Sequence, residues 1–329
     1  MYKNYFKLTR NPFDLTPDPV CFVPTKRHCE ALAAIYYGVR QHKGFVVVTG
    51  EVGTGKTLLL RCLLDEFKGS RDIECAYVFN ARLTSTEFLQ YILSDFGLPT
   101  AGKNKCELLL DLGSFLVSRS KMKMTTVLIL DEAHLMSEDI LEEVRLLSNL
   151  ETTEDKLLQI VLAGQPELDM KLDSVGLRQL KQRVAVRTQL GPLDLEETRG
   201  YIDRRLQVAG ASFDPSTLFP DATVAAIFRH SKGLPRLINT ICENSLIVAY
   251  ANGENFVTPD IVGYVAKELR LDVISKSEIE RIRKPIEIDI LEFLNVMVDA
   301  YTALRRPPSG NSSAGTNLAV EVREREPYI

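Results

Sequence analysis

The chain has 329 residues, of which 45% are hydrophobic and 26% are charged, as in an ordinary globular protein. This length predicts two domains, or one domain with appended segments. A net charge of −4 and an isoelectric point near 5.8 give no global electrostatic reason to expect a nucleic-acid-binding protein.

The cysteine and hydropathy patterns indicate a reducing compartment. No C-x-x-C pair or histidine cluster accompanies the cysteines, so we expect buried free thiols. The six are Cys21, Cys29, Cys62, Cys75, Cys106 and Cys242. We find no signal peptide and no uncharged apolar run of about 18 residues. The nearest candidate, residues 285–304, carries four acidic side chains. We therefore expect a cytoplasmic protein that reaches the inner membrane only through a partner.

Strand and helix patterns alternate through the first half of the chain. The segment up to about Val23 is rich in proline and aromatic residues and predicts an extended stretch lying on the main body. Strands are expected at residues 45–49, 73–79, 126–130, 157–163 and 184–190. Helices are expected at residues 28–40, from 55, from the capping box at 84, and at 106–118 and 138–150. This alternation predicts a parallel, three-layer α/β domain.

Beyond Pro192 the strand patterns stop. Helix signals follow at Asp194, at residues 234–250 and at Thr258, so a small all-helical lid domain is expected. The predicted boundaries are 1–40 for the N-terminal segment and helix, 41–192 for the α/β domain, 193–270 for the lid, 271–305 for a helical extension and 306–329 for a disordered tail. The amphipathic helix expected at 286–304 either docks on a partner or packs on the lid.

A glycine-rich motif follows the first predicted strand. Gly50-Glu-Val-Gly-Thr-Gly-Lys-Thr57 matches G-x-x-x-x-G-K-[ST] at every fixed position, with a leucine-rich helix after it. Glycines let the backbone N–H groups face a phosphate at the helix N-terminus. The motif predicts an ATP site in which Lys56 reaches the β- and γ-phosphates and Thr57 binds Mg²⁺. The expected nucleotide-binding residues are Gly50, Glu51, Val52, Gly53, Thr54, Gly55, Lys56, Thr57 and Leu58.

Two carboxylates end the third predicted strand. Asp131 and Glu132 follow four apolar residues, at the sheet edge where open α/β folds bind ligands. We expect Asp131 to hold Mg²⁺ through water and Glu132 to orient and deprotonate the attacking water. The alternative is that both acids cap the next helix. The nearby His134 is either a surface histidine or part of a proton relay.

Further stretches occur in the order found in one family: residues 11–19, the glycine-rich motif, residues 129–135, 146–151 and 160–168, Gln182-Arg183, and residues 233–239. Over about residues 1–268 the chain resembles the AAA+ ATPases of the general secretion pathway protein A (ExeA) family. The Leu-Ser-Asn-Leu-Glu and Gly-Gln-Pro-Glu-Leu stretches are not generic to P-loop proteins. The resemblance implies an AAA+ fold, ATP hydrolysis and a homo-oligomer.

The resemblance also implies two polar sensors. Asn80, after the second strand, would sense the γ-phosphate and restrain Glu132. Gln165, after the fourth strand, would occupy the sensor-1 position. A turn residue and a loop amide, respectively, are the structural alternatives. The N-terminal aromatic segment either contacts adenine or packs across the core.

Two arginines complete the implied machinery. Arg183 would be an arginine finger for a neighbouring subunit, although nearby Arg178 or Arg187 could take this role, or the group could be a solvated basic face. Arg236, in Gly-Leu-Pro-Arg, would be sensor 2. An arginine at a helix start opposes the helix dipole and calls for an anion nearby.

The chain differs from the family in one respect. We expect a short form without the membrane-spanning helix and peptidoglycan-binding domain of the secretion proteins. The leading hypothesis is an ATPase that drives or regulates assembly of a secretion or polysaccharide-export system, with an envelope protein as partner. One alternative is an ATP-dependent DNA-binding regulator of transposition of the TniB type. Only the basic residues at 178–187 support it. Another is a non-hydrolysing scaffold, against which the Asp131-Glu132 pair argues.

Overall fold

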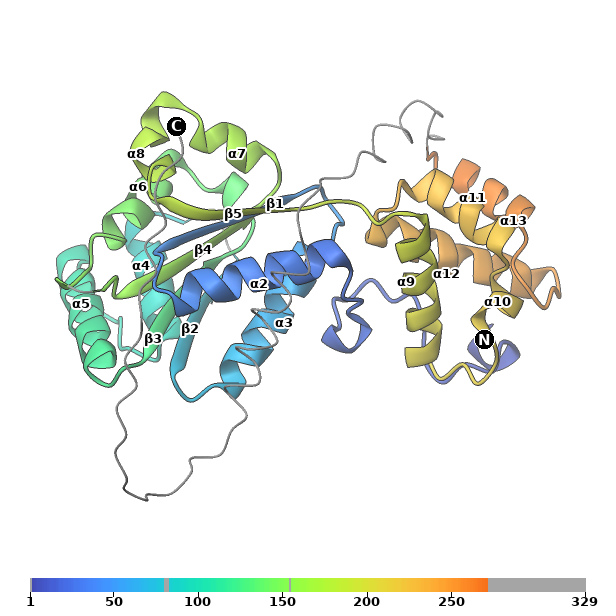
Figure 1. Ribbon diagram of the computed structural model, residues 1–329, viewed down its shortest axis with the longest axis horizontal. Coiled ribbons are helices and arrows are strands. Elements are labelled where there is room, and N and C mark those ends of the chain that lie inside the picture. The colour runs from blue at the N-terminus through green and yellow to red at the C-terminus, as the bar shows by residue number, and fades with distance from the viewer. Residues whose placement is uncertain (1, 80–82, 154, 272–329) are drawn as a thin grey trace, which may run out of the picture. The chain divides into compact units, whose positions relative to one another are not determined.

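The computed structural model describes residues 2–79, 83–153 and 155–271. Its centre is a five-stranded sheet in the order β2-β3-β4-β1-β5, with all neighbouring strands parallel (Figure 1). The strands are β1 Phe45–Gly50, β2 Ile73–Val78, β3 Thr125–Leu130, β4 Leu158–Gly164 and β5 Val184–Leu190. The predicted parallel α/β fold is confirmed.

Helices cover both faces of the sheet. Helices α2 and α3 form one core with Val46 and Val48 of β1, whereas α4, α5 and α6 form another with Phe45 and Val47 (Figure 1). Successive residues of β1 therefore enter opposite cores, and β1, β3 and β4 are buried along their whole length. This explains why the three central strands read as continuous apolar runs. The covering helices are α2 Lys26–Arg40, α3 Lys56–Gly69, α4 Ser85–Asp95, α5 Lys105–Lys121 and α6 Glu138–Leu147.

Helix α6 ends three residues before the predicted limit of 150. Ser148 caps it, and the N–H groups of Asn149 and Leu150 turn back to carbonyls only three residues away. Shorter elements follow in this half of the chain, namely η2 Ala133–Leu135, α7 Glu167–Leu172, η3 Val175–Leu177 and α8 Arg178–Lys181.

Every described element after β5 is helical, as predicted. A capping box joins Asp194 and Glu197 at the start of α9, and Thr258 caps α13 ahead of Pro259. Helix α11 was not expected from the sequence. The helices are α9 Leu195–Val208, α10 Pro215–Leu218, α11 Asp221–Ser231, α12 Pro235–Ala251 and α13 Pro259–Glu268.

The N-terminal segment packs on these helices. It contains α1 Tyr2–Tyr5 and η1 Pro19–Cys21. Phe6 and Phe13 are buried in the helical core, and the Phe13 ring lies 5.7 Å from that of Phe219. The predicted packing of this segment is confirmed, but the prediction that it is extended was wrong for these two short helices, where i to i+3 and i to i+4 backbone hydrogen bonds form.

All six cysteines are free thiols, as predicted, but only Cys21 and Cys242 are buried. The prediction of burial was wrong for Cys29 and Cys106, which are exposed on α2 and α5. It rested on the usual burial of free thiols, which says nothing of the helix face that each cysteine occupies. The predicted helix at 286–304 and the tail from 306 lie outside the described residues. Within the described ranges, no helix is both long enough and apolar enough to cross a lipid bilayer.

Candidate active site

The glycine-rich motif forms the turn between β1 and α3. Gly53 and Gly55 have φ values of 83° and 98°, which glycine adopts without a steric penalty. The first hydrogen bond into the helix runs from Leu59 N to Gly55 O. The N–H groups of Lys56, Thr57 and Leu58 thus form the open start of a helix, which is a favourable position for an anion.

Lys56 is buried beneath this turn. Its Nζ donates hydrogen bonds to the carbonyl oxygens of Gly50 and Glu51, at 2.6 and 3.0 Å. An ammonium group has three donors, so one N–H has no acceptor within the described chain. Burial lowers the pKa of Lys56, and the nearby carboxylates, led by Glu132 and Asp131, oppose that effect. The amine lies between backbone carbonyls and a group of acids.

Asp131 is held by three donors. Its Oδ2 accepts from Thr57 Oγ1 at 3.0 Å and from the Tyr77 hydroxyl at 2.9 Å, and its Oδ1 accepts from Glu132 N at 2.8 Å. The carboxylate is almost fully buried. Burial, and then the charge of Asp131, raise the pKa of Tyr77. The side chain that ends β3 is therefore fixed against the first turn of α3.

Tyr77 did not emerge from the sequence. Its residue in β2 pairs with Ile129 in β3, which brings its hydroxyl to the acid that follows β3. The sequence shows only a hydroxyl near the end of a strand. Its proximity to Asp131 can be inferred only when the neighbouring strand is known. We refer to Lys56, Thr57, Tyr77, Asp131 and Glu132 as the central cluster.

Glu132 has an unusual backbone and an unsatisfied oxygen. Its φ is 51°, in the left-handed region that non-glycine residues seldom adopt. Its Oε2 is buried and accepts no hydrogen bond from the described residues. The Nδ1 atom of His134 lies 3.4 Å from this oxygen, but it already accepts the N–H of Gln165 at 3.4 Å. A neutral His134 therefore gives no proton to Glu132 through Nδ1.

The strand order brings Gln165 into this region. Strand β4 lies between β1 and β3, so Gln165, immediately after β4, follows the strand between the glycine-rich turn and Asp131. Its backbone N–H contacts His134, as described above. Asn80 lies outside the described residues.

Arg236 comes to the same turn from the helical region. It is the second residue of α12, and its backbone N–H donates to Gly53 O at 3.3 Å. A Cβ on Gly53 would lie 2.9 Å from the Cβ of Arg236. The glycine thus allows the close approach of α12, and the exposed arginine side chain begins beside the turn.

The basic segment at 178–187 lies elsewhere on the chain. Arg183 donates to Ser148 Oγ and, at 3.4 Å, to Arg145 O, where it satisfies the carbonyl end of α6. Arg187 pairs with Asp169 at 2.8 Å. The side chain of Arg178 is exposed and has no hydrogen bond or ion pair within the part of the chain that the structure describes.

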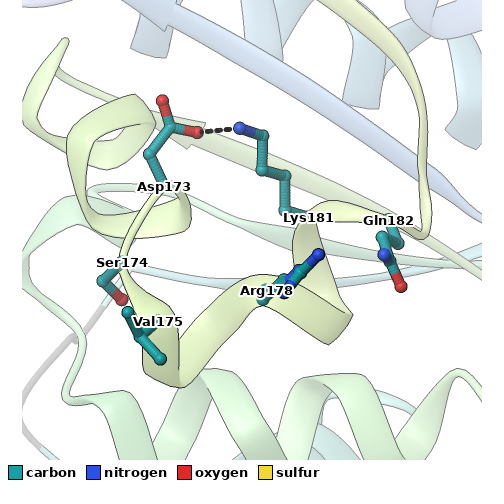
Figure 2. A pocket seen from close by; sticks show the side chains of 6 residues that line it. All are labelled: Asp173, Ser174, Val175, Arg178, Lys181 and Gln182. Carbon is teal, nitrogen blue, oxygen red and sulfur yellow. Dashed lines mark ion pairs between the residues drawn. The ribbon is translucent and has the colours of Figure 1, made fainter.

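A shallow pocket borders this segment. Figure 2 shows Lys181 reaching Asp173, with an ion-pair distance of 2.7 Å. The lining residues are Asp173, Ser174, Val175, Arg178, Lys181 and Gln182. The pocket contains none of the central cluster, so the chemistry predicted from the sequence does not lie there.

The central cluster offers oxygen ligands of the kind that Mg²⁺ takes. The described residues hold no group of three or more His, Cys, Asp or Glu side chains suited to a metal. Mg²⁺ at phosphate sites needs only one or two protein ligands, because water and phosphate supply the rest. The Thr57 hydroxyl and the Asp131 carboxylate, 3.0 Å apart, fit that requirement.

Comparison with known proteins agrees with this geometry. Residues 39–172 match the AAA domain family. The chain is 40% identical over 270 residues to general secretion pathway protein A of Aeromonas hydrophila, covering 82% of this chain and 48% of the relative. It thus spans about half the length of that relative. The resemblance predicted from the motifs is confirmed, and the match to the AAA domain family spans strands β1 to β4 of the sheet.

Solved structures share the fold at low identity. Cdc6p from Pyrobaculum aerophilum is 19% identical, with a TM-score of 0.59, covering 83% of this chain and 74% of that one. The Aeropyrum pernix ORC2 protein, solved as ADPNP-ADP complexes, is 18% identical with a TM-score of 0.56, covering 89% and 79%. At these identities the likeness concerns the fold alone.

Proposed function

We propose that this chain, which contains an AAA domain, binds Mg-ATP at Gly50–Thr57 and hydrolyses it. The observation that carries the proposal is the 3.0 Å hydrogen bond between Thr57 Oγ1 and Asp131 Oδ2. It joins the start of α3 to the acid that ends β3, so the expected phosphate-binding and metal-binding groups lie together. In open α/β sheets this edge is the usual ligand site.

The nucleotide phosphates are proposed to lie along the open start of α3. The unshared N–H groups there are suited to phosphate oxygens, and Lys56 has one donor left to reach them. Bound Mg²⁺ would neutralise charge on the phosphates. Thr57 and Asp131 would hold it, and Tyr77 would keep the Asp131 carboxylate oriented.

Glu132 is proposed as the group that orients and deprotonates the attacking water. Its Oε2 is buried and lacks a donor within the described residues, so it has a free acceptor position for a water proton. A buried acceptor without a partner costs free energy, and a catalytic role is one explanation for its presence.

We propose sensor roles for Gln165 and Arg236, and the places that these residues occupy support them. Gln165 follows the strand between the phosphate turn and Asp131, and it contacts His134, which lies beside Glu132. Arg236 begins beside Gly53, and we propose that it contacts the γ-phosphate from the helical lid. Asn80, the second polar sensor implied by the family, stays a prediction.

Arg183 is proposed as the arginine finger of a neighbouring subunit in a homo-oligomer. It precedes β5 and is anchored to the end of α6 in the single chain. To reach another subunit's phosphates it must exchange its contacts with Ser148 and Arg145 O for the nucleotide. This exchange would make the finger's position dependent on assembly.

For the biological role, we propose that ATP turnover drives or regulates assembly of a secretion or polysaccharide-export system through an envelope protein. The support is the 40% identity to general secretion pathway protein A. The alternative of a DNA-binding regulator gains little from the basic segment. Lys181 and Arg187 pair with Asp173 and Asp169, and Arg183 caps α6, so only Arg178 lacks a partner among the described arginines and lysines of the segment.

The decisive experiment separates nucleotide binding from turnover. We expect Lys56→Ala to abolish ATP binding, and Glu132→Gln to keep binding but reduce phosphate release by at least about 100-fold, because a general base contributes about 10² to 10⁴ in rate. Binding is measured by isothermal titration with ATP and Mg²⁺, and turnover by phosphate release. Unchanged release by Glu132→Gln would contradict the assignment of the base.

A further inference from the structure

His28 lies behind the phosphate-binding turn and does not belong to the central cluster. It belongs to the first turn of α2 and is 6% exposed. Its Nε2 lies 3.2 Å from the carbonyl oxygen of Thr54, in the middle of the glycine-rich motif. A carbonyl oxygen only accepts hydrogen bonds, so Nε2 must carry the proton in this contact.

The other ring nitrogen is held from the opposite side. His28 Nδ1 lies 2.7 Å from Thr25 Oγ1, the side chain that caps α2. With Nε2 protonated, a neutral imidazole accepts the Thr25 hydroxyl proton at Nδ1. Burial lowers the pKa of His28, which agrees with the neutral form. Both nitrogens are therefore satisfied, and the ring orientation is fixed.

The carbonyl that His28 holds belongs to the peptide that presents Gly55 N–H. In a trans peptide, the C=O and N–H bonds point in opposite directions. No cis peptide occurs among the described residues, so a Thr54 carbonyl directed at His28 turns the Gly55 N–H to the other side. That N–H donates to no acceptor within the described chain.

Gly55 itself makes room for this contact. It adopts φ 98°, and a Cβ on it would lie 3.2 Å from His28 Nε2. The absence of a side chain thus lets the imidazole reach the backbone. In a flexible glycine-rich turn, a peptide can rotate unless something fixes it, because glycine has access to both signs of φ.

We propose that His28 is a positioning residue that keeps the Thr54–Gly55 peptide turned so that the Gly55 N–H faces the nucleotide phosphates. This inference rests on the proposed ATP site and adds a group from α2 to it.

Three variants separate the two contacts of the ring. His28→Gln keeps an N–H near the position of Nε2, His28→Asn keeps one only near Nδ1, and His28→Leu keeps neither. The measured quantity is the affinity for ADP with Mg²⁺, by isothermal titration of the full chain. We expect the Gln variant to bind within about twofold of wild type and the Asn and Leu variants about fivefold more weakly, the usual net worth of one hydrogen bond.

Thermal unfolding of the nucleotide-free variants distinguishes positioning from a structural role. If His28 only packs the core, ADP affinity follows the melting temperature across the three variants. If it positions the peptide, the Gln and Asn variants differ in affinity whatever their melting temperatures. Equal ADP affinities for Gln and Asn, or no loss in either, would overturn the proposal.

The wild-type and Lys56→Ala proteins keep this result apart from the proposed function. ADP binding by wild type and its loss in Lys56→Ala support the nucleotide site. A flat His28 series on that background overturns the positioning role alone. Absence of ADP binding in wild type overturns the nucleotide site, and the role of His28 with it.

Discussion

The central cluster and the basic segment at 178–187 differ in how their charged side chains are held. Lys56 and Asp131 are buried and hydrogen-bonded to groups of their own chain, so their geometry is set in the single subunit. The ion pairs of Lys181 and Arg187 are exposed, and Arg183 is occupied at the end of α6. The first region is prepared for a ligand, whereas the second must exchange partners to act on one. If Arg183 acts as the proposed arginine finger, a single chain lacks the arginine that its neighbour supplies.

Of the substitutions that compare the two regions, Arg183→Ala is expected to have the largest effect on ATP turnover. We predict that Arg183→Ala lowers phosphate release by at least about 100-fold, because an arginine finger contributes about 10³ to 10⁵ in rate. Arg178→Ala is the matched control, since its exposed side chain has no partner within the described residues. The control is expected to keep wild-type turnover.

A mixing experiment shows whether Arg183 acts between subunits. Arg183→Ala protein keeps a complete central cluster, and Glu132→Gln protein keeps the finger. Mixed oligomers should regain part of the activity that each variant lacks, as measured by phosphate release at varied ratios. A structural role at the end of α6 would not be rescued in this way. Full activity of a monomeric protein would also contradict the assignment.

A smaller effect is expected on stability, where one substitution in each region removes a polar contact. Tyr77→Phe removes a donor from buried Asp131, and we expect the free energy of unfolding to fall by about 1.5 to 3 kcal/mol, the range for hydrogen bonds to charged groups. Asp169→Asn breaks the exposed pair with Arg187 and should cost less than about 1 kcal/mol. Urea denaturation of the nucleotide-free proteins measures both. Equal losses would show that the surface pairs matter as much as the central contacts.

The smallest effect concerns pH. Burial lowers the folded-state pKa of His28 below its ordinary 6.5, so the unfolded chain binds a proton first as pH falls. The stability due to neutral His28 is present above about pH 6.5 and is lost below it. Wild type should therefore lose more stability between about pH 7 and about pH 5 than His28→Gln.

The control for this measurement lies in the other titrating groups. The pKa of His230 is also lowered by burial, and the pKa of Glu197, near Thr25, is raised by burial. Both remain in the Gln variant, so their contributions cancel to the extent that the substitution leaves them unchanged. Parallel stability curves for the two proteins would contradict the prediction.

Local patterns predicted much of the fold. The three fully buried strands, the capping box at Thr84 and the glycine-rich motif each depend on neighbours in sequence, so they were located within a few residues. Helix α11 was missed because Pro220 precedes it in place of a capping side chain. Burial of the cysteines was misjudged for the exposed Cys29 and Cys106.

What the sequence determined by itself was the chemistry of consecutive residues. In Gly50–Thr57 and in the Asp131-Glu132 pair, the residue types that we propose for function are neighbours in sequence. Each group lies in a single turn or at a single strand end, so its spacing is visible in the sequence. Only the tertiary structure brought Tyr77 to Asp131, Arg236 to Gly53 and His28 to Thr54. These contacts depend on strand order and on the packing of helices far apart in the chain, and no local pattern encodes either.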